Sequence, residues 1–338
     1  MSDRLQFGVR LDQGLAPREC VTLAQTAEAA GFSSVWFAEN PFERGVLPAV
    51  SACAALTERI GIGVGIVTPY NRHPALIATE FGALDELASG RVLLGIGSGI
   101  GARIEKMGLA YRPLAALEDA VHIVRGLLNG DEVGYLGRVF SADRIKLGFR
   151  PPRPDMPIYL ASMGDRSLAR CGRIGDGLIV SNMCPPGYTE RAVGIVADSA
   201  AAAGRPMPKI VQYVPCVVRS DGDEARRNAL TAIAGMLAMF WPSDRDWPPL
   251  RDTIVGHTGI PKREIVAALD RLRRGQPAEA VLDERYIAAF AVAGTAEDCF
   301  AQAQRFRRAG VDELVLTFAG PQPAVDMAYF GRAVLALG

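Results

Sequence analysis

The chain lacks the signatures of several large classes of protein. Its 37 basic and 37 acidic residues cancel, so its net charge favours neither nucleic acid nor an anionic membrane as a partner. No C-x-x-C, H-E-x-x-H, G-x-S-x-G or Walker A pattern occurs, so zinc, iron–sulfur, hydrolase and kinase sites have no motif. The three histidines stand alone: we expect His73 to cap a helix, and His122 and His257 to be structural or surface residues. We therefore expect no metal site.

Signals for secretion and membrane insertion are also missing. The six cysteines are scattered along the chain, which is typical of proteins kept in a reducing compartment. Residues 1–10 contain no apolar stretch of the kind found in signal peptides. The longest uncharged run, residues 228–243, is too short to cross a membrane. These absences predict a soluble, cytoplasmic protein that acts on a small-molecule substrate.

The most informative stretch is IGIGVGIVTPYNRHP, which runs from Ile60 to Pro74. Its first half alternates isoleucine or valine with glycine. Glycine packs nothing and weakens a strand, so this pattern indicates that a flat or bulky group approaches one face closely. A polar turn follows, and Pro74 suits the first position of a helix, where no amide donor is needed. A ligand and the packed interior of a barrel both fit this stretch.

Units of one strand followed by one helix repeat along most of the chain. The pattern predicts strands, separated by helices, over residues 6–11, 34–38, 60–67, 91–96, 158–161, 177–181, 210–218 and 312–318. This repetition favours an α/β fold, a closed (β/α)8 TIM barrel, with an open doubly wound sheet as the alternative. We expect one domain over residues 1–338, with a hairpin insertion near 132–149. A charged, proline-rich excursion near 241–285 is expected to hold one helix near 262–274.

Catalytic groups of a barrel lie on the turns that follow the carboxyl ends of its strands. Those turns offer one carboxylate here, Glu39 beside Asn40, together with small residues and many backbone amides. Small residues and backbone amides of this kind can bind a large planar cofactor and its phosphate, and the cofactor then carries out the chemistry. The turn of residues 161–164 precedes a helix whose free N–H groups fit a phosphate, although an ordinary turn has the same composition.

The motifs at these turns resemble the luciferase-like oxidoreductase superfamily. Within it, the chain is most similar to the branch that uses coenzyme F420, typified by methylenetetrahydromethanopterin reductase. The most specific part is GIVTPYNRHP at residues 65–74, followed by GRVLLGIGSG at 90–99. The patterns RIGDGLIVS at 173–181 and AGVDELVLTF at 309–318 are commoner and support it. The resemblance covers nearly the whole chain.

The resemblance implies a barrel, usually dimeric, that binds a flavin or deazaflavin at its carboxyl-terminal mouth. The implied reaction is hydride transfer between C5 of the deazaflavin and an organic substrate. A non-proline cis peptide bond between Gly65 and Ile66 is expected behind the central ring. The loop at 161–164 is expected to hold the ribityl phosphate, and Ser98 to flank the polar side of the cofactor. The implied cofactor-binding residues are Gly65, Ile66, Val67, Thr68, Gly97, Ser98, Gly99, Ala161, Ser162, Met163, Gly164 and Ser181.

Two positions depart from the family pattern. Related F420 enzymes often carry Asp-His at the end of the second strand, where this chain has Glu39 and Asn40. An imidazole is therefore not carried over, and Glu39 becomes the candidate for handling a proton. Reductases of the methanopterin type have a glutamate in the first strand, where this chain has Arg10. The resemblance thus carries over the class of cofactor but not the substrate.

Three functions stay open. The first is an F420-dependent oxidoreductase with Glu39 and Asn40 next to the substrate, and basic residues such as Arg103 and Lys106 near the anionic F420 tail would favour it. The second is an FMN-dependent monooxygenase that uses oxygen and reduced flavin from a partner reductase. The third is a non-catalytic binding protein on the same barrel, against which the full set of glycine turns argues. Substrate selectivity is expected in the excursion, at Phe240, Trp241 and Trp247, unless the excursion is a loose surface segment.

Overall fold

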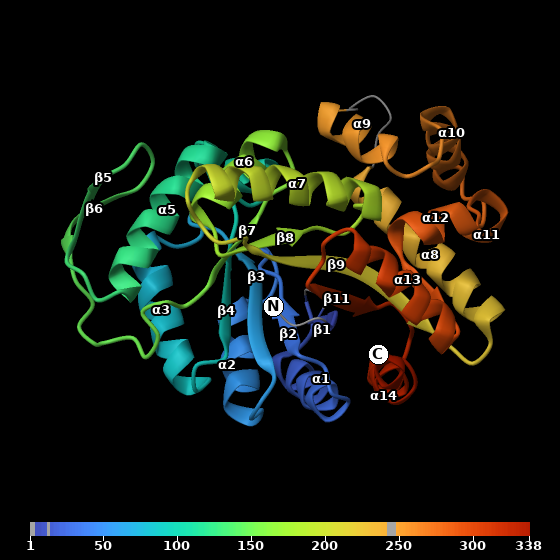
Figure 1. Cartoon of the computed structure of the whole chain (residues 1–338), viewed down its shortest axis with the longest axis horizontal. Coiled ribbons are helices and arrows are strands. Elements are labelled where there is room, and N and C mark those ends of the chain that lie inside the picture. Colours follow the sequence, from blue (N-terminus) through green and yellow to red (C-terminus); the bar gives the residue numbers. More distant parts are fainter. Residues whose placement is uncertain (1–3, 12–13, 242–247) are drawn as a thin grey trace.

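The computed structural model of the chain describes residues 4–11, 14–241 and 248–338. Eight parallel strands form a closed ring, shown in Figure 1. In ring order they are β11 (Glu313–Phe318), β1 (Gln6–Leu11), β2 (Ser34–Phe37), β3 (Gly61–Val67), β4 (Val92–Ile96), β7 (Ile158–Ala161), β8 (Gly177–Val180) and β9 (Lys209–Val218). Strand β9 pairs with both β8 and β11, which closes the ring. The predicted (β/α)8 barrel is confirmed, and the open sheet is excluded.

Helices connect the strands and cover the outside of the barrel (Figure 1). They are α1 (Pro17–Ala29), α2 (Val46–Leu56), α3 (Pro74–Leu87), α4 (Gly101–Lys106), α5 (Pro113–Leu128), α6 (Asp165–Ile174), α7 (Pro186–Ala202), α8 (Gly222–Phe240), α13 (Ala296–Arg308) and α14 (Pro323–Ala333), followed by the 3-10 turn η1 (Leu335–Leu337). Helices α1, α3, α5 and α7 each begin with proline, which fits the first helical position. Their buried faces join the outward-facing side chains of the strands in one large core.

Two segments interrupt the strand–helix alternation. Strands β5 (Val133–Leu136) and β6 (Ser141–Ile145) form an antiparallel hairpin against α5, within the range expected for an insertion. After α8 come α9 (Pro249–Gly256), α10 (Lys262–Arg273), α11 (Ala278–Val281), α12 (Glu284–Phe290) and the short strand β10 (Val292–Gly294). The helix predicted near 262–274 is confirmed as α10, whereas α9, α11 and α12 were not predicted. Most of the added helices have only one or two turns, too few to show a periodic apolar pattern.

The interior of the barrel explains the alternating glycines of β3. A Cβ atom added to Gly63 would overlap the indole of Trp36, and one added to Gly65 would overlap the hydroxyl of Tyr213. Trp36 packs edge-on against Tyr213, with ring centroids 6.1 Å apart, and against Tyr159, at 5.5 Å. The bulky groups that these two glycines admit are therefore side chains of the barrel itself. Of the two interpretations, the packed interior is the one that holds for them.

The excursion brings Trp241 into the core, where it is buried and packs edge-on against Phe290. Phe240, at the end of α8, is partly exposed. Trp247, the third aromatic residue expected to select a substrate, lies outside the described residues. No helix within the described ranges combines the length and the apolar character that a membrane crossing requires.

Candidate active site at the barrel mouth

The segment Gly65–Ile66 forms an irregular step near the carboxyl end of β3. Its peptide bond is cis, which confirms the bond expected from the resemblance. The register between β3 and β4 shifts between Val64 and Val67, so this segment bulges out of regular pairing. Ile66 is partly exposed and lies directly against Gly97, where an added Cβ would come 2.9 Å from Ile66 Cγ1. The turn after β4 must therefore be glycine to lie this close to the bulge.

Glu39 follows β2 and is held by two residues of the turn after β3. Its Oε1 atom accepts a hydrogen bond from Arg72 Nη1 at 2.5 Å, and its Oε2 atom accepts one from Asn71 Nδ2 at 2.8 Å. Only 7% of the Glu39 side chain is exposed. Asn40 instead shapes its own loop, because its Oδ1 atom accepts the backbone N–H of Phe42 at 3.2 Å.

A second carboxylate extends this cluster. Arg72 Nε lies 3.0 Å from Glu80 Oε2 on α3, so one guanidinium lies between two carboxylates. Burial raises the pKa of the Glu80 carboxyl; Arg72 opposes this effect and Glu39 adds to it. Arg72 and Glu80 were not predicted as site residues. Arg72 lies just before α3 and Glu80 lies on it, and charged residues at such positions are usually solvated. The carboxylate at this mouth is therefore one member of a three-residue charge cluster.

Tyr111 covers the glycine turn after β4. Its hydroxyl lies 3.2 Å from Ser98 Oγ and 3.1 Å from the carbonyl oxygen of Gly99. Its ring lies against Gly101, where an added Cβ would be 3.0 Å away, and tilts toward Tyr70 with centroids 5.9 Å apart. Tyr111 was not among the predicted site residues. It lies between two recognised segments, in a stretch without periodicity that gave no signal.

The loop after β7 presents an uncapped helix end. Gly164 is the N-cap of α6, and no side chain of the described residues caps it. The Met163 carbonyl oxygen accepts a hydrogen bond from the hydroxyl of Tyr188 on α7, which fixes the loop against that helix. Asp165, in the first turn, pairs with Arg191 at 2.7 Å. Free N–H groups at the start of a helix of this length fit a phosphate.

On three buried residues near the carboxyl ends of the strands, a polar side-chain atom has no hydrogen-bond partner among the described residues. The atoms are Ser162 Oγ after β7, Asn182 Oδ1 after β8 and Thr317 Oγ1 on β11. All three residues are at least nine-tenths buried. A buried polar atom without a partner costs about 1–3 kcal/mol, so these atoms are expected to bind a ligand or water. Together with the uncapped helix and the glycine turns, they fit a planar cofactor that carries a phosphate.

The remaining predicted residues lie around the same opening or next to it. Thr68 is buried and Ser181 partly exposed, each directly after its strand. Arg103 and Lys106 occupy the last turn of α4, and Lys106 is exposed. His73 caps α3, because its Nδ1 accepts the backbone N–H of Ala75 at 3.2 Å, which confirms its predicted role.

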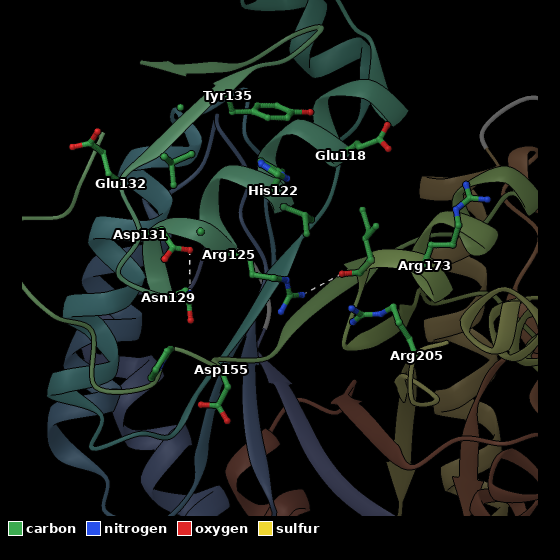
Figure 2. A pocket seen from close by; sticks show the side chains of 16 residues that line it. Glu118, His122, Arg125, Asn129, Asp131, Glu132, Tyr135, Asp155, Arg173 and Arg205 are labelled. Atoms are coloured by element: carbon green, nitrogen blue, oxygen red, sulfur yellow. Dashed lines mark hydrogen bonds between the residues drawn. The ribbon is translucent and has the colours of Figure 1, made fainter. Parts of the chain in front are cut away.

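A large cavity lies elsewhere, between the hairpin, α5 and the loops that precede β7 and β8 (Figure 2). Its volume is about 990 Å³, and none of the predicted site residues lines it. The labelled arginines come from α5, the end of α6 and the loop after α7, and two of them are paired: Arg125 and Arg205 both donate to Asp176, at 2.8 and 2.9 Å. Asp176 also accepts the backbone N–H of Ile158 at 3.0 Å. These pairs join α5, α7 and the barrel, so we assign them a structural role.

The chain is similar in sequence and in fold to known proteins. The model of the luciferase-like monooxygenase family matches residues 3–313. A 5,10-methylenetetrahydromethanopterin reductase of Archaeoglobus fulgidus is 28% identical, over 98% of this chain and 99% of the relative. An F420-dependent glucose-6-phosphate dehydrogenase of Beutenbergia cavernae is 32% identical, over 70% of this chain and 74% of the relative. In fold, the chain is similar to the solved F420-dependent tetrahydromethanopterin reductase of Methanopyrus kandleri, with a TM-score of 0.87, 24% identity and 99% coverage of both chains.

Proposed function

The chain belongs to the luciferase-like monooxygenase family, and on that premise we propose that it is an oxidoreductase that uses coenzyme F420 to transfer a hydride to or from a small organic substrate. Relatives of two kinds, the methylenetetrahydromethanopterin reductase and the F420-dependent glucose-6-phosphate dehydrogenase, support this choice of cofactor. The observation that carries it is that the Gly65–Ile66 bulge, the glycine turn after β4 and the uncapped start of α6 all follow or end the neighbouring strands β3, β4 and β7 on the carboxyl-terminal side of the barrel.

The residues of the cofactor side come from β3, β4, β7 and β8. Gly65 and Ile66 support the face of the ring system, and Val67 with Thr68 lies along it. Gly97, Ser98 and Gly99 form the wall beside the polar edge of the ring. Ala161, Ser162, Met163 and Gly164 hold the phosphate, with Ser181 beside them. When bound, F420 supplies or accepts a hydride at C5, and the protein contributes orientation and exclusion of water.

Glu39 handles the proton that accompanies hydride transfer. Its carboxylate is oriented by Arg72 and Asn71 and is mostly shielded from solvent. A carboxylate fixed in this way acts as a general acid or base only when a substrate atom lies within about 3 Å of it. Asn40 orders the loop that carries Glu39, which is a positioning role.

Affinity for F420 against FMN tests this proposal. We expect the purified protein to bind F420 tightly and FMN weakly in fluorescence and calorimetric titrations. The double variant Arg103→Ala/Lys106→Ala should lose about threefold or more in F420 affinity, because exposed pairs contribute up to about 1 kcal/mol each. FMN ends at its phosphate, so its affinity should not change. Arg173→Ala, in the separate cavity, is the control.

Two other outcomes of the titrations would contradict the proposal. Tight FMN binding with weak F420 binding would overturn the proposal in favour of an oxygen-activating monooxygenase supplied by a flavin reductase. Binding of neither cofactor would favour a non-catalytic barrel.

We also propose that the chain forms a homodimer. Helix α2 contains no charged residue, and its Leu56 is 55% exposed. On the neighbouring helix α3, Leu76 and Leu87 are 53% and 48% exposed. They are close to three helical turns apart and so lie on one face. Because exposed leucines on neighbouring helices offer apolar area that an interface would bury, a second copy of the chain is the proposed partner.

A further inference from the structure

Tyr111 joins the stretch before α5 to the glycine turn after β4. Its hydroxyl group lies 3.2 Å from Ser98 Oγ and 3.1 Å from the carbonyl oxygen of Gly99. Its ring lies over Gly101, where an added Cβ would be 3.0 Å from two of the ring carbons. A side chain at position 101 would therefore push the ring, and with it the hydroxyl group, away from Ser98.

The two contacts of the Tyr111 hydroxyl determine what Ser98 can do. A carbonyl oxygen can only accept, so the single hydroxyl hydrogen of Tyr111 is donated to Gly99. Both contacts are full hydrogen bonds at the same time only if the Ser98 hydroxyl donates to the Tyr111 oxygen. The Ser98 side chain carries no second hydrogen. Its oxygen therefore acts as an acceptor toward any further partner.

Ser98 lies between two glycines that face the end of β3. A Cβ added to Gly97 would come 2.9 Å from Ile66 Cγ1, and one added to Gly99 would come 3.3 Å from Thr68 Oγ1. This close approach ties the turn to the part of β3 that is proposed to support the cofactor ring. Ser98 itself is partly exposed, so its oxygen is accessible beside that part of the strand.

Neighbouring aromatic rings hold Tyr111 in place. Its ring centroid lies 5.9 Å from that of Tyr70 in the turn after β3, and the Tyr70 hydroxyl accepts the backbone N–H of Arg112 at 2.7 Å. Tyr70 also packs edge-on against Phe140 of the hairpin, with centroids 5.8 Å apart. Asp119 on α5 is 1% exposed and accepts the backbone N–H of Phe140 at 3.1 Å. The position of the Tyr111 hydroxyl is thus fixed by the fold before any ligand binds.

Resting on the proposed function, we infer that Tyr111 is a positioning residue of the cofactor site, which holds the Ser98 hydroxyl so that its oxygen accepts a hydrogen bond from the polar edge of the cofactor ring. That edge carries an N–H group between two carbonyl groups in F420, and the same is true of FMN. An oxygen that only accepts pairs with the N–H group and not with the carbonyl groups. Without the Tyr111 hydroxyl, the Ser98 hydroxyl rotates freely and has to be ordered on binding, which lowers affinity.

A double-mutant cycle tests this role. F420 is titrated by fluorescence into the wild type, Tyr111→Phe, Ser98→Ala and the double variant. Each single substitution should weaken binding by about fivefold, the usual effect of losing one neutral hydrogen bond. The double variant should bind no more weakly than Ser98→Ala, because Tyr111 acts through Ser98. A hydroxyl with a purely structural role would weaken binding equally with and without the Ser98 hydroxyl.

Controls separate this effect from a general loss of structure. Phenylalanine keeps the ring over Gly101, and circular dichroism with urea denaturation should show that every variant is folded. Tyr329→Phe removes a hydroxyl group from a partly exposed tyrosine of α14 and should bind F420 as the wild type does.

The outcomes distinguish this inference from the proposed function. If Tyr111→Phe binds F420 as well as the wild type, or weakens binding equally in the Ser98→Ala background, the inference is overturned and the proposed function stands. If the wild type does not bind F420, the proposed function fails, and the same cycle is run with FMN. Coupled losses of FMN affinity then support the role of Tyr111 in a flavin site. Uncoupled losses, unchanged FMN affinity or no FMN binding overturn it.

Discussion

The hydroxyl group of Tyr213 on β9 lies 3.4 Å from the carbonyl oxygen of Gly65 on β3. This contact crosses the barrel and joins its filled interior to the bulge at the mouth. Burial raises the pKa of the Tyr213 hydroxyl, so it stays protonated and donates to the carbonyl oxygen. The Gly65 carbonyl group, which belongs to the backbone proposed to support the cofactor ring, is therefore hydrogen-bonded to a buried side chain.

Gly65→Ala should disturb the contact between Tyr213 and the backbone of β3. The added methyl group would overlap the Tyr213 hydroxyl, and overpacking of this kind costs about 1–3 kcal/mol. We expect a comparable loss of stability and a drop of about tenfold in F420 affinity, measured by urea denaturation and by fluorescence titration. Adding Tyr213→Phe should restore part of both, because the hydroxyl oxygen is the nearest atom. Gly134→Ala is the control, since no atom lies within 4 Å of the added position. Equal effects of Gly65→Ala and Gly134→Ala would contradict the prediction.

Glu39→Gln should separate turnover from cofactor binding. The amide keeps the shape of the side chain but cannot exchange a proton, so turnover should fall by about 10²-fold or more. F420 affinity should stay within a factor of about two, because glutamine keeps the size of the side chain and the hydrogen bond that joins Glu39 to the proposed cofactor residues, from the Thr68 N–H at 3.4 Å, is long. Steady-state kinetics with a reducible substrate and F420 titration give the two quantities. Glu43→Gln, an exposed residue of the same loop, should change neither. Normal turnover of Glu39→Gln would end the assignment of a proton role.

The sequence predicted most of the barrel because each unit carries its own local signals. The strands at Gln6–Leu11 and Ile158–Ala161 have the predicted bounds, since apolar runs mark them. Strand β10 was missed because three residues are too few to show alternation. The helices α9, α11 and α12 of the excursion were missed because they are too short to show a helical repeat, whereas the longer α10 was predicted.

The site was harder to predict because its contacts join distant parts of the chain. The alternating glycines of β3 showed that something bulky fills the adjacent space, but Tyr213 lies 148 residues away from Gly65 and carries no local mark of that role. Arg72 lies just before a helix, and its partner Glu39 follows the neighbouring strand β2, so the pairing of β2 with β3 brings the two side chains together. Tyr111 lies in a stretch without periodicity, and its contact with Ser98 depends on how the long connection after β4 folds back.

Glu28 on α1 should make the stability of the protein depend on acid pH. Its carboxylate accepts the backbone N–H groups of Glu58, Arg59 and Ile60 at 3.0, 2.6 and 2.9 Å, which holds the entrance to β3. Burial acts to raise the pKa of this carboxyl, but the three N–H groups outweigh it, so the pKa lies below its ordinary value of 4.5. A lowered pKa in the folded state stabilises the protein above pH 4.5, and this contribution is lost as the pH falls through the folded-state value.

Replacing Glu28 with glutamine removes that dependence. We expect Glu28→Gln to be less stable than the wild type at pH 7 by about 1 kcal/mol, the usual net contribution of hydrogen bonds of this kind on a largely exposed group. The difference should shrink as the pH is lowered from about 5 to about 3. Urea denaturation across this range measures it. Glu86→Gln, an exposed carboxylate of α3, serves as the control and should show a constant difference. A gap between wild type and Glu28→Gln that stays the same at low pH would show that the three N–H groups do not favour the charged form.

Leu76→Glu and Leu87→Glu should convert the proposed dimer into a monomer. Each substitution places a charge among the exposed leucines of α2 and α3, where a second copy would have to bury it. Light scattering with size-exclusion chromatography should show a halved mass, while circular dichroism stays unchanged because both side chains are exposed in the single chain. Leu136→Glu, on the hairpin and 93% exposed, alters surface charge equally and should leave the mass of the wild type. A wild-type monomer, or a dimer that survives Leu76→Glu combined with Leu87→Glu, would place the subunit interface elsewhere or remove it. Persistence of F420 binding in the monomeric variant would further show that each barrel mouth holds its cofactor without residues from the partner.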